Sequence, residues 1–449
     1  MSKHQKILLA LLLGAISFAL MSMVLTTPQA SLVAIIVLMV TLWSNEGLPL
    51  AVVSLMPIVL FPAFGILTTK ETTINYAHPI IYLFLGGFLI AIAVEKSGLH
   101  KVIANKMLGI FPSSARGIIF ALIITSGLLS SVLSNTTTAL LLLPIALFLS
   151  DDVKIKMRLA LAIAYGASIG GILTPIGTPP NLILMGVMED YSLVAMPFVK
   201  WIYMVAPVVF VMFVVVGFTL SYGLSSYKLS VDIESHSLTF NQKKVALLIL
   251  LLIATLFLNA PIKPYYDGLG LSEPAILLAF GLVLFMPPFE ILDWVDDRES
   301  IPYRIMFLFG AGFAIAKAFT HTNLADEVAS KLIFFADMPF ILFLVVLAFL
   351  ITFTTEITSN TALISIMLPI LYKVAQNTGM DARLVMMVAT ICASYAFMLP
   401  IATPPNAIAM SSGVISIKDM AKYGFVFNII GIVTIVVVAK LLWIDVFSF

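Results

Sequence analysis

Long apolar stretches alternate with short polar segments along almost the whole chain, and this pattern predicts membrane-spanning helices. A helix needs about 20 predominantly apolar residues to cross the ~30 Å hydrocarbon core of a bilayer. Spans are predicted at residues 7–25, 29–44, 48–64, 80–95, 201–222, 244–260, 273–289, 304–319 and 424–443. The first stretch could instead be a signal peptide. It is longer than a usual signal core and the next span follows almost at once, which favours a retained span.

Other apolar stretches are interrupted by polar residues. Residues 117–149 are split at Ser134, and the second arm is short for a full crossing, so a re-entrant hairpin is predicted there. A second hairpin is predicted at residues 339–372. Interrupted helices are predicted at 158–188, with a break at 175–180, and at 384–399 continued by 405–415. Irregular backbone at membrane depth is tolerated only where it is buried in protein or lines a wet cavity.

The interrupted stretches carry the same motifs twice, at a constant numbering offset of 225. Ser134-Asn135-Thr136 corresponds to Ser359-Asn360-Thr361 at this offset. Thr178-Pro179-Pro180-Asn181 corresponds to Thr403-Pro404-Pro405-Asn406 at the same offset. Two composite motifs at one spacing are hard to obtain by chance, so the chain contains an internal duplication.

The duplication predicts an inverted architecture. The two units cover about residues 29–222 and 244–447, and a hydrophilic connector at 227–244 joins them. Each unit is predicted to hold five spans and one hairpin. Because five is odd and a hairpin adds zero or two crossings, the second unit must be inserted upside down. Inverted repeats with discontinuous helices characterise secondary transporters.

The distribution of Lys and Arg predicts the orientation. With the N-terminus inside, the cytoplasmic loops carry sixteen of these residues and the outer loops carry six. Cytoplasmic loops are the ones enriched in positive charge. We therefore predict a cytoplasmic N-terminus and an outer C-terminus, in a plasma membrane of the bacterial inner-membrane type. The first hairpin then enters from the cytoplasm and the second from outside.

The composition agrees with an all-α polytopic membrane protein rather than a soluble one. Of 449 residues, 61% are hydrophobic and 10% are charged, and the mean hydropathy is +1.12. A net charge of +1 argues against a nucleic-acid partner, and the lipid bilayer is the expected surrounding. The single cysteine, Cys392, and the scattered histidines form no disulfide framework or metal cluster. No catalytic constellation is recognisable, so an enzyme is not predicted.

The duplicated motifs combine hydroxyls, an amide and a helix start. Ser or Asn at a hairpin tip is a good N-cap, and Pro180 and Pro405 suit the first turn of a resuming helix. Four helix N-termini would converge if the two units pack around a pseudo-two-fold axis, and such termini attract anions. Side-chain and carbonyl oxygens in the same place suit sodium. Kinks or packing contacts are the alternative for either motif alone, but the duplication favours binding.

On these motifs the chain resembles the divalent anion/sodium symporter family, whose members transport dicarboxylates, citrate or sulfate. The paired Ser-Asn-Thr and Thr-Pro-Pro-Asn sequences are signatures of that family, and the resemblance covers essentially the whole chain. It implies eleven spans, two re-entrant hairpins and a homodimer. It also implies that a transport domain, at about 117–191 and 339–415, slides as an elevator against the remaining scaffold.

The resemblance also implies the binding residues. The anion is expected to contact Ser134, Asn135, Thr136, Thr178, Ser359, Asn360, Thr361, Thr403 and Pro404. One sodium site is expected at Ser130, Ser134, Asn135 and the carbonyl of Gly177, and the other at Thr355, Thr358, Asn360 and the carbonyl of Ala402. Ser130 and Thr355 each lie four residues before the motif serine, one helical turn away. Apart from the coupling sodium ions, no organic cofactor is implied.

Two charged residues lie within apolar stretches. Lys317 could be a counter-ion for the substrate, but it lies near a helix end, which favours a side chain that reaches the interface. Glu356 could be a proton-coupling carboxylate or a structural acceptor. Because the first unit has Ser131 at the equivalent position, the structural role is favoured.

The sequence therefore predicts sodium-coupled import of a divalent anion, most simply a C4-dicarboxylate such as succinate, malate or fumarate. A sodium-independent dicarboxylate exchanger, or a sulfate or citrate carrier on the same scaffold, remains open, since family members that exchange anions retain the Ser-Asn-Thr motifs. A channel would need a continuous polar pore, and paired occluding tips argue against one.

Overall fold

The computed structural model describes residues 1–194, 196–224, 227, 229, 237–261, 265–332 and 338–448, and its regular elements over these residues are helices. Part of the predicted connector lies outside the described residues. The helices of the first half are α1 (Lys3–Met21), α2 (Thr27–Asn45), α3 (Leu50–Ala63), α4 (Thr69–Thr73), α5 (Pro79–Ser97), α6 (Leu99–Ile110), α7 (Ala115–Ser130), α8 (Asn135–Phe148), α9 (Val153–Gly171), α10 (Pro179–Asp190) and α11 (Phe198–Ser221).

The second half follows the same order after the connector. Its helices are α12 (Phe240–Asn259), α13 (Glu273–Val283), α14 (Trp294–Asp297), α15 (Tyr303–His321), α16 (Leu324–Lys331), α17 (Phe340–Thr355), α18 (Asn360–Thr378), α19 (Ala382–Ala393), α20 (Pro404–Ser411), α21 (Ile417–Val438) and α22 (Ile444–Ser448). Between α21 and α22 the chain makes one π-helical turn at Ala439–Trp443.

The predicted duplication is present in the helix boundaries. The first residues of α7 and α17, and also their last residues, are related by the numbering offset of the motifs. The same offset relates the first residues of α8 and α18, and those of α10 and α20. The motif serines, Ser134 and Ser359, are the N-caps of α8 and α18, as their side-chain chemistry predicts. The order of the elements is therefore repeated, and the inversion of the second unit stays a prediction.

Helix length and composition agree with a multi-pass membrane protein. Within the described residues, 7 helices are long and apolar enough to cross a bilayer. They are α1, α2, a segment from α4 through α5, α11, α12, α15, and a segment from α21 to Phe447. The hairpin arms α7, α8 and α17 are shorter apolar helices, and so are α3 and α13, where full spans are predicted at residues 48–64 and 273–289. The total of eleven spans stays a prediction.

The second interruption is longer than the sequence suggests. The predicted helix from 384 to 399 is wrong at its end, because α19 stops at Ala393 and the chain is non-helical until α20. The side chain of Glu356 accepts the backbone N–H groups of Met398 and Leu399, at 2.9 and 3.0 Å. These backbone groups therefore have partners without a helix.

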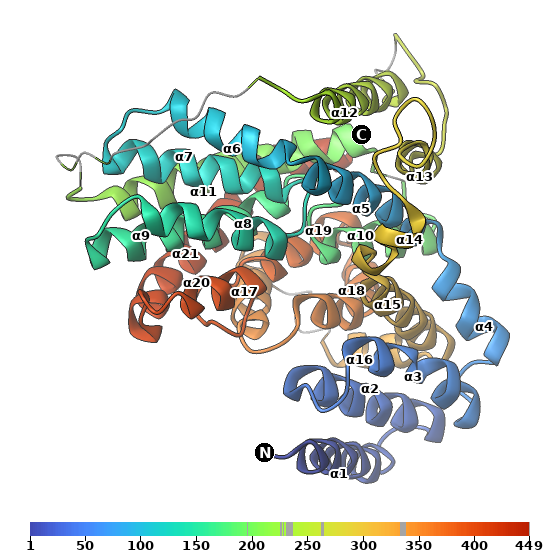
Figure 1. Cartoon of the computed structure of the whole chain (residues 1–449). Helices are drawn as coiled ribbons and strands as arrows, with labels where there is room; N and C mark the ends of the chain where they lie inside the picture. Colours follow the sequence, from blue (N-terminus) through green and yellow to red (C-terminus); the bar gives the residue numbers. More distant parts are fainter. Residues whose placement is uncertain are drawn as a thin grey trace.

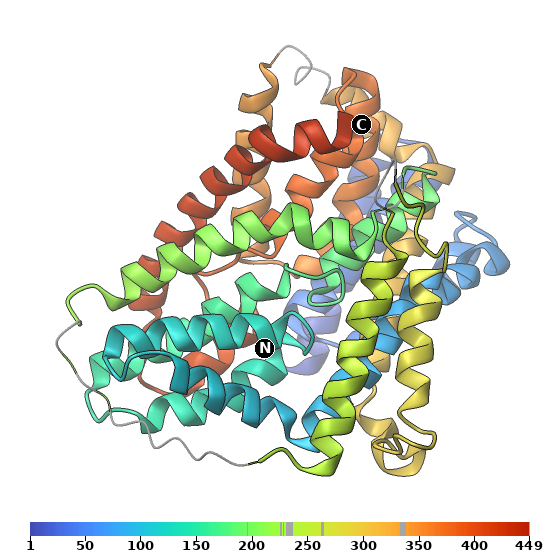
Figure 2. The ribbon, with the colours of Figure 1, turned by 90° about the horizontal axis from the view of Figure 1, so that it is seen from above.

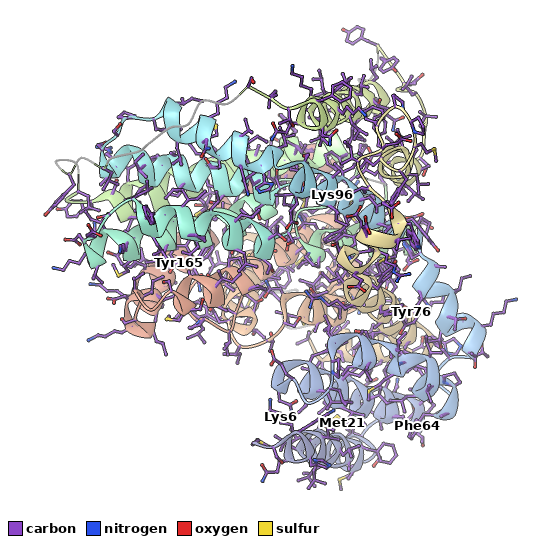
Figure 3. All side chains as sticks on the ribbon, viewed as in Figure 1. Lys6, Met21, Phe64, Tyr76, Lys96 and Tyr165 are labelled. Carbon is purple, nitrogen blue, oxygen red and sulfur yellow. The ribbon has the colours of Figure 1, made fainter. Side chains whose placement is uncertain are left out.

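The hairpins and interrupted helices pack together on one side of the molecule, with α1–α5 and α12–α16 on the other (Figure 1). Helix α10 packs on α18 and α19, and α20 packs reciprocally on α8 and α9. Figure 2 shows α11 and α21 side by side across the bundle, and both also pack on hairpin helices. Tyr165, labelled on α9 in Figure 3, is fully buried against Phe397 and Phe427.

Very close helix packing holds the first interrupted helix in place. A Cβ atom added to Gly170 of α9 would lie 2.1 Å from the Cα of Gly127 on α7. Both positions are on helices in the buried part of the bundle, and only small residues let the two backbones approach this closely.

We expect Gly170→Ala to destabilise the protein by about 1–3 kcal/mol, because the new methyl group meets backbone atoms that cannot rotate away. Thermal unfolding of the detergent-purified protein would measure the change. Gly14→Ala is the matched control, since its Cβ would lie 3.3 Å from the nearest atom. Equal melting temperatures for the two variants would contradict this account of the packing.

Candidate functional site

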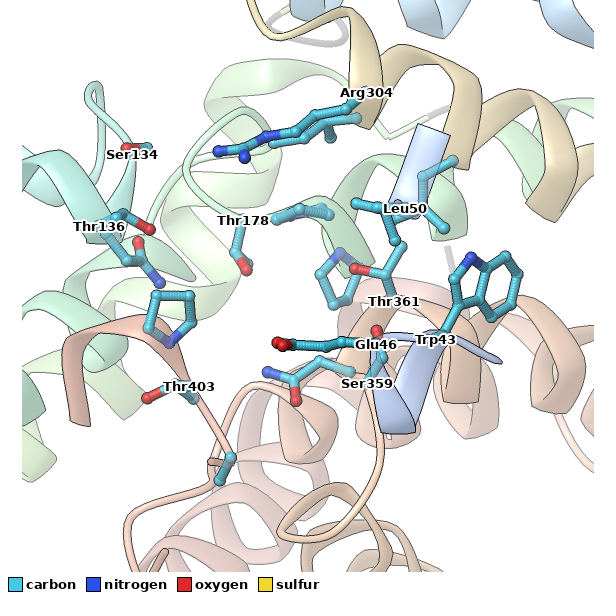
Figure 4. Close-up of a pocket in the computed structure, with 18 of the residues that line it drawn as sticks. Trp43, Glu46, Leu50, Ser134, Thr136, Thr178, Arg304, Ser359, Thr361 and Thr403 are labelled. Carbon is cyan, nitrogen blue, oxygen red and sulfur yellow. The ribbon is translucent and has the colours of Figure 1, made fainter. Parts of the chain in front are cut away.

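Both copies of the duplicated motifs line one cavity of about 940 Å³. Figure 4 shows Ser134, Thr136 and Thr178 of the first unit across from Ser359 and Thr403 of the second. All nine residues predicted to contact the anion lie on its wall, namely Ser134, Asn135, Thr136, Thr178, Ser359, Asn360, Thr361, Thr403 and Pro404. The structure therefore gathers the predicted set into one place.

Four helix N-termini meet at this cavity. They are the first residues of α8, α10, α18 and α20, which come from both units. Ser134 Oγ accepts the N–H of Thr137 at 3.0 Å, and Thr403 Oγ1 accepts the N–H of Asn406 at 3.4 Å. The partial positive charge of converging N-termini favours an anion in the cavity. The reciprocal packing of α10 and α20 on the opposite unit's hairpin brings these ends together.

A pair of side-chain oxygens lies behind each hairpin tip. Ser130 Oγ donates to Asn135 Oδ1 at 2.5 Å, and Thr355 Oγ1 donates to Asn360 Oδ1 at 2.6 Å. Thr355 Oγ1 is also 2.8 Å from the carbonyl oxygen of Ala393. Both hydroxyl residues are fully buried. Neutral oxygens gathered in this way are the donor set that a desolvated sodium ion needs.

Glycines place the first interruption against the first tip. A Cβ on Gly171 would lie 2.6 Å from Asn135 Oδ1, and a Cβ on Gly177 would lie 2.3 Å from the carbonyl oxygen of Gly171. Gly177 and its counterpart Ala402 both line the cavity. The end of α9 thus lies against Asn135, and Gly177 lies against the end of α9. The carbonyl of Gly177 as a sodium ligand stays a prediction.

Thr358, the remaining predicted sodium ligand, donates its hydroxyl to the carbonyl oxygen of Thr354 at 2.8 Å. Like Ser130 and Thr355 it does not line the cavity, and its role as a sodium ligand stays a prediction. Lys317 is exposed and lies outside the cavity, which suits a side chain that reaches the interface rather than a substrate counter-ion.

Two buried asparagines hold the interruptions open, a role that the sequence analysis did not assign. Asn181 Nδ2 donates to the carbonyl oxygen of Thr174 at 2.9 Å, and Asn406 Nδ2 donates to that of Leu399 at 3.1 Å. Both asparagines are fully buried, and their carbonyl partners are related by the offset of the duplicated motifs. Both asparagines end the duplicated Thr-Pro-Pro-Asn sequence, and this is the sequence feature from which their role could have been predicted.

Glu356 is a structural acceptor in this state. It is 3% exposed, and besides Met398 and Leu399 it accepts the amide of Asn428 on α21 at 2.6 Å. A buried carboxylate that accepts three hydrogen bonds has its polar atoms satisfied without binding a coupling proton. It ties the second hairpin to the second interruption and to α21.

The charged residues of the cavity were not predicted from the sequence. Arg304 at the start of α15 and Glu46 at the end of α2 both point into it in Figure 4, and Lys3 and Lys6 contribute to its wall. They lie outside the duplicated motifs, so no repeat pointed to them.

The comparisons with known proteins agree on one family. A family model described as a citrate transporter matches residues 36–391. The sodium-dependent dicarboxylate transporter SdcS of Staphylococcus saprophyticus is 31% identical over 97% of this chain and 91% of that protein. SdcS of Staphylococcus aureus strain USA300 is 32% identical over 96% of this chain and 90% of that protein.

Solved transporter structures share the fold. MtrF of Neisseria gonorrhoeae, an antimetabolite efflux pump, aligns with a TM-score of 0.60 at 15% identity, over 93% of this chain and 95% of that one. YdaH of Alcanivorax borkumensis aligns with a TM-score of 0.58 at 15% identity, over 83% of this chain and 87% of that one. At this identity the likeness concerns the fold alone.

We expect Glu356→Ala to lower the free energy of unfolding by about 3 kcal/mol or more, because it leaves three buried donors without an acceptor and each costs about 1–3 kcal/mol. Thermal unfolding in detergent measures the loss. Glu299→Ala, at an exposed position, is the control. A melting temperature for Glu356→Ala equal to that of the control would contradict the structural role.

Proposed function

Because this chain belongs to the divalent anion/sodium symporter family, we propose that it imports a C4-dicarboxylate such as succinate, malate or fumarate together with sodium. It is a membrane transporter and not an enzyme. Its relatives are named as sodium-dependent dicarboxylate transporters, which supports sodium as the coupling ion and a small anion as the substrate. We place it in the plasma membrane, with the N-terminus in the cytoplasm.

The observation that carries this proposal is the repeated pairing of a buried hydroxyl with a tip asparagine. Ser130 with Asn135, and Thr355 with Asn360, place oxygens directly behind the helix N-termini that line the cavity. A sodium ion at each pair would lie next to an anion held at those N-termini. Opposite charges in adjacent sites lower the cost of burying one another.

Coupling follows from the asparagines, which take part in both sites. Asn135 and Asn360 line the anion cavity, and their side-chain oxygens contact the buried hydroxyls. A bound sodium would fix each amide so that its tip presents an ordered surface to the anion. With one ion missing, buried polar groups would be uncompensated, so the partly filled site is costly to move across the bilayer.

The transport step in this proposal is an elevator movement of the hairpins and interrupted helices. The moving part would hold residues 117–191 and 339–415, as the resemblance implies. We extend it by α11 and α21, which the resemblance left in the scaffold, because both of these helices pack on the hairpin arms. Helices α1–α5 and α12–α16 would form the static part, which is also where we place the homodimer contact.

The exposed rim of the cavity indicates the direction in which it opens. Met1, Glu46 and Arg304 are exposed and line the cavity. All three lie on the side that the charge distribution assigns to the cytoplasm. We therefore take this structure as the inward-open state of the proposed cycle.

Citrate is the second candidate substrate, because the matching family model is described as a citrate transporter. Hydroxyls, amides and helix N-termini accept carboxylates of either anion. The choice between the two depends on how many carboxylates the cavity accepts.

We expect proteoliposomes to take up labelled succinate only with an inward sodium gradient. Asn135→Ala and Asn360→Ala should each reduce that uptake at least tenfold, because each substitution removes a ligand of the anion and a ligand of sodium. A tenfold change corresponds to about 1.4 kcal/mol. Asn105→Ala, on α6 outside the cavity, is the matched control. Sodium-independent uptake that needs dicarboxylate inside the vesicles would identify an exchanger, and preference for citrate would correct the substrate.

We expect Ser130→Ala and Thr355→Ala to act on sodium more than on the anion, because neither hydroxyl lines the cavity. The sodium concentration for half-maximal uptake should rise about three- to tenfold, as for loss of one ligand worth about 1 kcal/mol. The KM for succinate at saturating sodium should change little. An equal rise in both quantities would argue against separate sodium sites.

A further inference from the structure

The charges of the cavity are divided unequally between its walls. The duplicated motifs contribute hydroxyls, amides, prolines and helix N-termini, all of them uncharged side chains. Among the described residues that line the cavity, the charged side chains are Lys3, Lys6, Glu46 and Arg304. All four come from α1, the end of α2 and the start of α15, which we assign to the static part.

Arg304 presents a free guanidinium to the cavity. It is the second residue of α15, and Figure 4 shows its side chain extending over the cavity toward Thr178. Within the described part of the chain it forms no ion pair and no side-chain hydrogen bond. A guanidinium offers five N–H donors in a planar arrangement that matches a carboxylate.

Glu46 is held in place by an unusual turn. Its φ of 52° is in the left-handed region, which a residue with a side chain seldom adopts. Asn45 secures this turn, because its Oδ1 accepts the N–H of Gly47 at 2.8 Å and its Nδ2 donates to the carbonyl oxygen of Lys6 at 3.0 Å. Backbone strain of this kind concentrates at ligand-binding positions.

The turn directs the Glu46 carboxylate into the cavity beside Ser359 and Thr361, opposite the first unit's tip (Figure 4). Glu46 forms no ion pair with Arg304 or with any other described residue. The cavity wall therefore carries one unpaired carboxylate, Glu46, and three cationic side chains, Lys3, Lys6 and Arg304, for which no ion pair is found among the described residues.

We propose that Arg304 and Glu46 form a charge filter that selects dicarboxylates over tricarboxylates. This rests on the proposed function. One carboxylate of the substrate would lie at the helix N-termini and the second would face Arg304. A third carboxylate would have to lie near Glu46, where like charges repel. Specificity of this kind combines an attractive element for one ligand with a repulsive element against its competitor.

Binding to the full-length protein in nanodiscs, measured by isothermal titration calorimetry, tests the filter without the complication of transport direction. Succinate and citrate are titrated at fixed sodium, at a pH where citrate is fully ionised, and at two ionic strengths set with a choline salt. We expect the wild-type protein to bind succinate more tightly than citrate.

Removing the negative charge should relax the selection. In Glu46→Gln we expect the affinity for citrate to rise about tenfold relative to that for succinate, because like-charge contacts across an interface are costly and citrate carries one more negative charge. Glu299→Gln, an exposed residue outside the cavity, is the control. An unchanged citrate-to-succinate ratio in Glu46→Gln would overturn the filter.

Removing the positive charge should weaken both anions and reduce the effect of salt. In Arg304→Gln we expect succinate to bind about tenfold more weakly at low ionic strength, with a smaller loss at high ionic strength, where the attraction is screened. Arg304→Lys should restore part of the affinity. Lys317→Gln, outside the cavity, is the matched control.

The two proposals fail in different ways. If Arg304→Gln binds succinate with the same affinity and the same salt dependence as the wild-type protein, the filter is overturned and the proposed function stands. Wild-type protein that binds neither anion in sodium would overturn the proposed function, and the filter with it.

Discussion

Backbone N–H and C=O groups at the two helix interruptions must find partners in a largely apolar interior, and the rest of the site depends on how they do so. Hydrocarbon offers no hydrogen bonds, and each unsatisfied buried group costs several kcal/mol. Asn181 and Asn406 satisfy carbonyl groups just beyond the ends of α9 and α19, and Glu356 satisfies N–H groups in the second interruption. The chain can then be non-helical at the two interruptions, and its polar backbone groups can line the cavity there.

The two units meet this constraint with different atoms at equivalent positions. In the first unit Thr174 Oγ1 donates to the carbonyl oxygen of Ser131, and in the second the Glu356 carboxylate accepts the N–H of Leu399. Each pair joins a hairpin tip to the interruption beside it, and the two pairs are related by the offset of the duplicated motifs. The duplicated geometry has therefore been kept while the side chains that hold it have diverged.

This divergence explains which features the sequence could predict. The hairpins and the interruptions follow from motifs that combine helix caps with prolines, and the repeat removes the ambiguity of each motif alone. The nine cavity residues follow from the family resemblance that these motifs carry. The early end of α19 could not be predicted, because the partner of Met398 and Leu399 is Glu356, 42 and 43 residues away. Glu46 and Arg304 were missed for a related reason, since a single charged residue near a helix end usually lies in the interface.

The division of charge between the walls also bears on coupling. A part that moves across the bilayer with a dianion must compensate two negative charges during the step. The described cavity residues of the proposed moving part have uncharged side chains, and Arg304 belongs to the proposed static part. Glu356 is negative when ionised and is already satisfied by its three donors, so it supplies no positive charge. In the proposed mechanism the compensating charges would travel with the cargo, and two sodium ions at the two hydroxyl–asparagine pairs would neutralise the dianion. An exchanger would need a cationic residue on the moving wall, so the neutrality of the described residues that line that wall favours symport.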